Sequence, residues 1–123
     1  LVKLITDEKT LWDTNKPKVV MDDDDFAILF SRHCIPFLRG VEKKDWNEEF
    51  NFYKHIGMYA YRFDTLKEIC GLKPSRLEKA ENLEQLRWIE GGYRIKAAIT
   101  EEEAFSIDTP EDLEELLKSE TGL

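Results

Sequence analysis

Polar and aromatic side chains alternate with apolar ones in the segment 53–62, which reads YKHIGMYAYR. Because successive side chains of a β-strand point to opposite faces, a strand here would have one polar and one apolar face. The polar face would carry His55, Gly57, Tyr59 and Tyr61, and the apolar face Ile56, Met58 and Ala60. This pattern suggests a binding site on the polar face, but it is also typical of a half-buried sheet.

Further side chains suited to binding fall in a loop, on a helix and at a strand end. Arg32 and Arg39 lie in a long irregular stretch, Glu84 and Gln85 on a helix, and Asp108 at the expected carboxyl end of a strand. In α/β sheets ligands and metals bind at that end of the strands. Guanidinium groups bind carboxylates, whereas histidine, tyrosine, glutamate and glutamine hydrogen-bond to hydroxyls. The combination predicts a site for an acidic sugar.

Two simpler interpretations remain open for these residues. The acidic side of a helix that carries Glu78, Glu81 and Glu84 is most often a solvated face. Asp108 precedes Pro110, and it could simply help to cap the helix that starts there. The sequence pattern does not decide between these interpretations and a binding site.

The hydrophobic pattern predicts an α/β layer architecture with a mixed sheet, part of it parallel. Strands are expected at 1–5, 18–21, 26–30, 53–62 and 93–100, and helices at 65–70, 74–90 and 110–118. Ser75 and Glu78 predict a capping box at the start of the longest helix. Its apolar stripe would consist of Leu77, Ala80, Leu83 and Leu86.

Composition excludes several classes of function. The 123 residues fit one domain or one piece of a larger protein, and the net charge of −8 argues against a nucleic-acid partner. We expect no membrane span and no secretory signal, hence a cytoplasmic location. The four aspartates at 22–25 lack the glycine and glutamate of an EF-hand, so a solvated turn is expected. Cys34 and Cys70 are expected to be free thiols, without the paired spacing of a zinc site.

Four segments, in this order, carry a resemblance to a known family: FSRHCIPFLRG, HIGMYAYR, PSRLEKAENLEQLRWIE and IDTPEDLEEL. They resemble the second half of the 3-deoxy-D-manno-octulosonate (KDO) cytidylyltransferases, also called CMP-KDO synthetases. The similarity runs over essentially the whole chain. It implies the carboxy-terminal part of a Rossmann-like nucleotide-diphospho-sugar transferase fold.

The resemblance also implies a reaction and a set of site residues. The anomeric hydroxyl of KDO would attack the α-phosphate of CTP, giving CMP-KDO for lipopolysaccharide biosynthesis and pyrophosphate, with Mg²⁺ assistance. Residues that match the family's KDO-binding positions are Arg32, Arg39, His55, Tyr59, Glu84 and Gln85. Asp108 matches its magnesium ligand, and no residue is assigned as a general acid or base.

Two positions depart from the family pattern, and one large part of it is absent. Asp25 stands where a glycine is usual and Arg76 where a proline is common, both outside the expected site. No glycine-rich phosphate loop occurs in the 123 residues. We therefore expect residues 1–123 to be a single carboxy-terminal fragment for sugar binding and dimerisation, without the nucleotide-binding half, inactive alone and homodimeric. The alternatives are a cytidylyltransferase for another acidic sugar, such as a sialic acid, and a non-catalytic dimerisation or interaction module.

Overall fold

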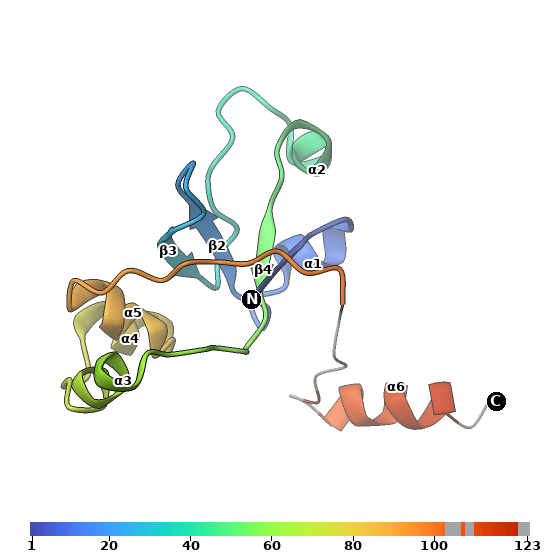
Figure 1. Ribbon diagram of the computed structural model, residues 1–123. Helices are drawn as coiled ribbons and strands as arrows, with labels where there is room; N and C mark the ends of the chain where they lie inside the picture. The colour runs from blue at the N-terminus through green and yellow to red at the C-terminus, as the bar shows by residue number, and fades with distance from the viewer. Residues whose placement is uncertain (103–106, 108–109, 121–123) are drawn as a thin grey trace.

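The computed structural model describes residues 1–102, 107 and 110–120, and within them it shows a four-stranded sheet with short helices (Figure 1). The strands are β1 (Val2–Leu4), β2 (Lys18–Met21), β3 (Ala27–Ser31) and β4 (Tyr53–His55), in the order β1-β4-β2-β3. The three ladders between these strands are antiparallel. The expected α/β class is confirmed, but the expected parallel part of the sheet is reduced, among the described residues, to an isolated parallel bridge between Val2 and Ile99.

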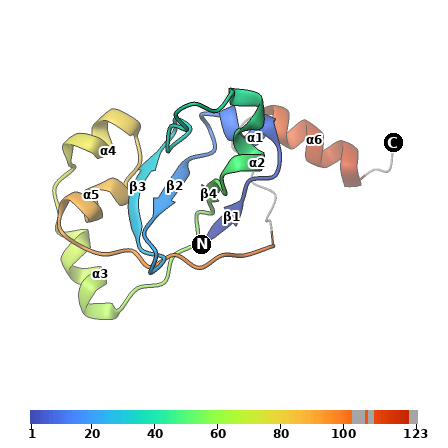
Figure 2. The same cartoon turned by 90° about the horizontal axis from the view of Figure 1, so that it is seen from above.

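The described residues also form helices. They are α1 (Glu8–Trp12), α2 (Trp46–Glu49) after the 3-10 turn η1 (Lys43–Asp45), α3 (Phe63–Cys70), α4 (Arg76–Glu81), α5 (Gln85–Glu90) and α6 (Pro110–Glu120). Helices α3, α4 and α5 gather on one side of the sheet, and α1 and α2 lie on the other (Figure 2). In the part of the chain described here, no helix is both long enough and apolar enough to cross a membrane.

The aspartate run forms the turn of the β2–β3 hairpin, as expected. The Asp22 carboxylate accepts hydrogen bonds from the backbone N–H of Asp24 at 3.0 Å and of Phe26 at 2.8 Å. Asp25 takes a positive φ of 59°, a conformation that aspartate tolerates better than most residues. Arg94 covers the ring of Phe26 with its guanidinium carbon 3.6 Å from the ring centroid. The turn is therefore held by its own hydrogen bonds and by contacts with the segment 94–97, including the Ala97 N–H, which donates to the Asp25 carbonyl at 2.8 Å.

The strand expected over 53–62 is much shorter in the structure. β4 ends at His55, and the Met58 N–H then donates to the Ile56 carbonyl at 2.6 Å, a tight three-residue turn around Gly57. Glycine weakens a strand because it has no side chain to pack. Met58 is 63% exposed, so the expectation that it faces the core is wrong. The alternation of faces holds only as far as His55.

The helix expected over 74–90 is two helices. The capping box of Ser75 and Glu78 is present and starts α4. Asn82 then adopts the left-handed conformation, with φ 54° and ψ 49°, and ends α4 before α5 begins at Gln85. Asparagine is one of the few residues that adopts this conformation readily. The chain therefore changes direction in the middle of the predicted apolar stripe.

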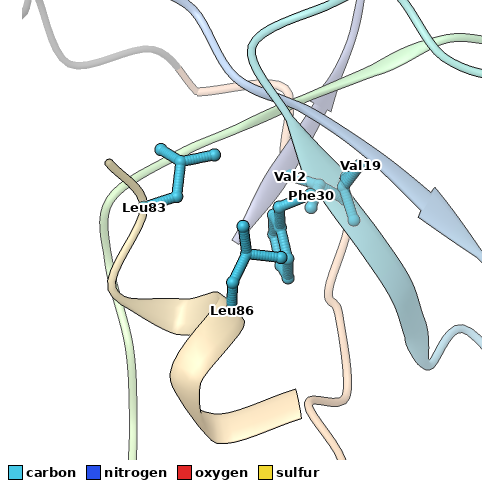
Figure 3. Close-up of a cluster of buried hydrophobic side chains, with 5 residues drawn as sticks. All are labelled: Val2, Val19, Phe30, Leu83 and Leu86. Carbon is cyan, nitrogen blue, oxygen red and sulfur yellow. The ribbon is translucent and has the colours of Figure 1, made fainter. Parts of the chain in front are cut away.

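This break decides which leucines reach the core. Leu83 and Leu86 are buried against Val2, Val19 and Phe30 on one face of the sheet (Figure 3). The leucine on α4, Leu77, is 41% exposed. A second cluster, formed by Ile5, Leu11, Cys34, Trp46 and Phe52, packs elsewhere in the molecule. Only the carboxyl-terminal half of the predicted stripe is part of the core.

The segment expected as a strand at 93–100 is extended but makes only isolated bridges in the described structure. Its carbonyl groups accept hydrogen bonds at both edges of the sheet. The Ala27 N–H donates to the Ile95 carbonyl at 2.9 Å, and the Val2 N–H donates to the Ala98 carbonyl at 3.0 Å. In Figure 1 this segment, drawn in orange, runs across the sheet between those two contacts. It ties the first strand to the β2–β3 hairpin.

We expect Leu86→Ala to destabilise the protein much more than Leu77→Ala. Leu86 is fully buried, and emptying such a site costs about 2–5 kcal/mol because a cavity remains. The same truncation at the exposed Leu77 should cost less than about 1 kcal/mol. Urea unfolding of both variants measures the difference. Equal losses would show that the two leucines share one buried stripe, as a continuous helix requires.

Candidate functional site

His55 lies at the end of β4, on the sheet face that α5 covers. It pairs with Val2 across the sheet, and its ring meets Phe30 edge-on with centroids 5.4 Å apart. Burial lowers the pKa of His55 to about 4, so the imidazole is neutral at pH 7. A neutral imidazole offers one donor and one acceptor.

The Tyr59 ring packs against the His55 ring, although the chain between the two residues is not a strand. The two rings lie with their centroids 5.3 Å apart. Burial raises the pKa of Tyr59, and the nearby Tyr61 and Glu84 raise it further, so the phenol stays protonated. The turn at Gly57 thus brings together two side chains that the sequence pattern placed on one face, although by a different backbone path.

Gln85 is the first residue of α5 and is 5% exposed. Its Nε2 has no hydrogen-bond partner among the residues the structure describes, and the same is true of His55 Nε2 and the Tyr59 hydroxyl. The fourth buried side-chain atom in this condition is Asn47 Oδ1 on α2. Buried polar groups are normally paired, so an unpaired group calls for an explanation. Three of the four belong to the predicted sugar-binding set.

Glu84 stands immediately before α5 and is exposed. One of its carboxylate oxygens lies 3.8 Å from the Arg87 guanidinium. Arg87 itself forms a two-pronged ion pair with Glu78, at 2.8 and 2.5 Å, and holds the pKa of that carboxyl at about 2. Glu78 also closes the capping box of α4, so this ion pair joins the start of α4 to α5. The acidic side of the predicted helix is therefore only partly a solvated face.

The two predicted arginines have different surroundings. The Arg32 guanidinium donates to the carbonyl oxygens of Glu81 at 2.7 Å, Thr14 at 3.1 Å and Asn82 at 3.2 Å. These bonds use three of its five N–H groups and leave two for a ligand. Arg39 is exposed in the loop after β3, and the structure does not bring it to His55.

A cavity of about 710 Å³ opens beside His55 and Tyr59. Its other polar lining includes Tyr61, Arg62 and Arg94. Arg32, Arg39, Glu84 and Gln85 are not among the described residues that line it. The structure therefore brings two of the six predicted binding residues to the cavity, and places Gln85 at the start of the adjoining helix α5 and Glu84 immediately before it.

Comparison with known proteins decides the family. A family model described as "Cytidylyltransferase" matches residues 1–102. The chain belongs to the cytidylyltransferase family. A relative in Cytophaga hutchinsonii named 3-deoxy-manno-octulosonate cytidylyltransferase is 57% identical over 114 residues, which are 92% of this chain and 46% of the relative. A relative of the same name in Bacteroides thetaiotaomicron is 50% identical over 125 residues, covering 97% of this chain and 50% of the relative.

A solved structure supports the same assignment. It is the structure of CMP:2-keto-3-deoxy-manno-octonic acid synthetase complexed with CTP, with a TM-score of 0.80 and 32% sequence identity. The similarity covers 99% of this chain and 48% of the solved chain. The chain spans about half the length of the curated relatives it matches.

Sequence reasoning missed several residues that line the cavity of this cytidylyltransferase chain, among them Arg62, Arg94 and Trp88. Trp88 lines the cavity and contacts Tyr59 with ring centroids 5.1 Å apart. It lies three residues after Gln85, so the two share one side of α5. This spacing could have identified it, but the apolar residue was not considered as part of a polar site.

This cytidylyltransferase chain also contains the predicted magnesium ligand and two thiols. Asp108 lies outside the described residues. No group of three or more histidine, cysteine, aspartate or glutamate side chains that could hold a metal occurs in the searched part of the chain. Both cysteines are free, and burial raises the pKa of Cys34 to about 11. Cys34 is therefore a poor nucleophile.

We expect the neutral state of His55 to make stability depend on pH. Its pKa is about 4 in the folded state and about 6.5 when unfolded, so the unfolded chain binds more protons between these values. The free energy of unfolding should therefore fall as the pH falls from about 6.5 to about 4. His55→Phe, which keeps a ring but cannot titrate, should lose less stability over this range. Urea unfolding at several pH values tests this, and equal losses in both proteins would contradict a buried neutral histidine.

Proposed function

We propose that this chain is the carboxy-terminal, sugar-binding half of a cytidylyltransferase that couples KDO to CTP, giving CMP-KDO and pyrophosphate for lipopolysaccharide biosynthesis. Support comes from the relatives, whose names state this activity and of which the chain covers about half. The match to a solved synthetase complexed with CTP supports it further. The remaining half, outside these 123 residues, would bind the nucleotide.

The observation that carries the sugar site is the set of three buried polar atoms without partners. His55 Nε2, the Tyr59 hydroxyl and Gln85 Nε2 have none in the described structure. Leaving such an atom unpaired costs about 1–3 kcal/mol, a cost that a bound ligand with hydroxyl groups would remove. All three groups are uncharged at pH 7, which suits hydroxyls better than a carboxylate.

Cations around this neutral set would bind the carboxylate of KDO. Arg32 keeps two free N–H groups, and Arg62 and Arg94 line the cavity. We keep Arg39 and Glu84 in the proposed binding set because they match the family's KDO-binding positions. They would contact the sugar in the whole protein. A guanidinium binds a carboxylate in a two-pronged geometry that an ammonium cannot match.

The reaction needs positioning and charge neutralisation. The anomeric oxygen of KDO forms a bond to the α-phosphorus of CTP, the bond from that phosphorus to the pyrophosphate oxygen breaks, and the hydroxyl proton is lost. Residues of this chain would hold the sugar with that hydroxyl directed at the nucleotide. Mg²⁺ would offset the phosphate charge, with Asp108 supplying one ligand and the substrate phosphates and an aspartate of the other half supplying more. We propose a cytoplasmic homodimer.

Turnover should require the complete gene product. We expect that product to release pyrophosphate from CTP when KDO and Mg²⁺ are present, and residues 1–123 alone to show no turnover because they hold no phosphate loop. A coupled pyrophosphate assay on both proteins measures this, with a sialic acid in place of KDO as the matched substrate control.

Each of the other outcomes would contradict a different part of the proposed function. Turnover with the sialic acid and not with KDO would indicate a cytidylyltransferase for another acidic sugar. Turnover by residues 1–123 would contradict the assignment as an inactive half. No turnover by the complete product, together with no heat of KDO binding in calorimetry, would indicate a dimerisation or interaction module.

Tyr59→Phe should weaken sugar binding and stabilise the free protein. The variant removes an unpartnered buried hydroxyl and keeps the ring, so the free energy of unfolding should rise by about 1 kcal/mol. The KM for KDO should rise about tenfold, the value of one lost hydrogen bond in a buried site, while the KM for CTP stays within about twofold. Tyr53→Phe, on β4 and not among the residues that line the cavity, is the control. A Tyr59→Phe protein with unchanged KM for KDO would remove this tyrosine from the sugar site.

A further inference from the structure

Trp88 occupies a central place among the rings beside the candidate site. It lies on α5, is 8% exposed and meets two tyrosines edge-on. Its ring centroid is 5.1 Å from that of Tyr59 at an interplanar angle of 85°, and 5.7 Å from that of Tyr61 at 86°. Edge-to-face geometry at these distances is a favoured arrangement of aromatic pairs.

Tyr59 depends on such ring contacts for its position. Its hydroxyl has no partner within the described structure, and its backbone lies beyond the end of β4. No strand pairing therefore orients Tyr59; instead its ring contacts the rings of His55 at 5.3 Å, Tyr61 at 5.9 Å and Trp88 at 5.1 Å. Of these neighbours only Trp88 belongs to a helix.

Helix α5 is a firm base for this contact. Leu86 fixes the helix to the sheet, where it is fully buried against Phe30, as Figure 3 shows. Arg87 ties the same helix to the capping box of α4 through Glu78. Gln85 precedes Trp88 by about one turn, so one rigid element carries both a predicted sugar contact and the ring that meets Tyr59.

We propose that Trp88 is a positioning residue for sugar binding: its indole holds the Tyr59 phenol in the orientation in which the hydroxyl, His55 and Gln85 bind one ligand. This role rests on the proposed function, because the ligand is the acidic sugar. Trp88 acts through Tyr59 and needs no polar contact of its own. The loss of affinity for KDO that follows replacement of Trp88 should therefore depend on whether the Tyr59 hydroxyl is present.

A double-mutant cycle in the complete gene product tests this dependence. The variants are Trp88→Leu, Tyr59→Phe and the two together, assayed for pyrophosphate release with KDO and CTP. We expect Trp88→Leu to raise the KM for KDO about tenfold, with the KM for CTP and kcat within about twofold. In the Tyr59→Phe background the same change should raise it less than about twofold, because the hydroxyl that Trp88 positions is gone. Trp88→Phe, which keeps an aromatic edge, should restore most of the affinity.

Trp46→Leu is the matched control for general destabilisation. Trp46 is a buried tryptophan in the second hydrophobic cluster and is not among the residues that line the cavity. The Trp46→Leu variant should have a melting temperature lowered at least as much as that of Trp88→Leu, and an unchanged KM for KDO.

Two results would overturn the positioning role. Equal effects of Trp88→Leu with and without the Tyr59 hydroxyl would show that Trp88 does not act through it, and a raised KM in Trp46→Leu would show a general loss of stability. Failure of the proposed function is seen separately, since the unaltered protein would then show no KDO-dependent turnover.

Discussion

The arrangement of the site depends on the break between α4 and α5 at Asn82. The left-handed residue ends α4, and the Arg32 guanidinium holds the break by donating to the carbonyls of Glu81 and Asn82. The Glu81 carboxylate in turn accepts hydrogen bonds from the backbone N–H of Arg32 at 2.9 Å and from the Ser31 hydroxyl at 2.6 Å. The end of β3 and the end of α4 are thus locked together. Because α5 starts afresh from this point, Leu86 can enter the core while Trp88 lines the cavity.

The polar atoms left unpaired beside this helix oppose folding. Three of them, on His55, Tyr59 and Gln85, belong to a neutral set, and each unpaired atom costs about 1–3 kcal/mol. A chain under selection for stability alone would replace such groups with apolar ones of similar shape. Their presence in a well-packed region is therefore a stronger indication of ligand binding than their residue types are. The sequence pattern could not provide this argument, since it does not reveal which polar atoms lack partners.

Local signals in the sequence were sufficient for the elements whose causes are local. The Ser75 capping box, the aspartate turn and the strand pairs around it follow from side chains that bond to their own backbone. Two elements are shorter than expected, for different reasons. The strand after Tyr53 stops at His55 because of the local turn around Gly57, whereas the predicted long helix breaks where Arg32, about fifty residues earlier, binds its carbonyls. Trp88 was missed because an apolar stripe does not show which of its members touch a polar site.

Charge places a further requirement on the site. The 123 residues carry a net charge of −8, which repels anionic ligands at long range, so an anionic ligand of this cavity would need local cations. His55 and Tyr59 cannot supply this charge, because burial keeps His55 neutral and Tyr59 protonated. Arg94 is partly neutralised by Asp22 at 3.5 Å, an exposed pair that contributes little and is easily exchanged for another anion. The cations that line the cavity, among them Arg62, Arg94 and Lys96, are the groups that can bind an anion there, whereas His55 and Tyr59 offer hydrogen bonds without charge. Charge and neutral hydrogen bonding thus come from different residues of the same cavity.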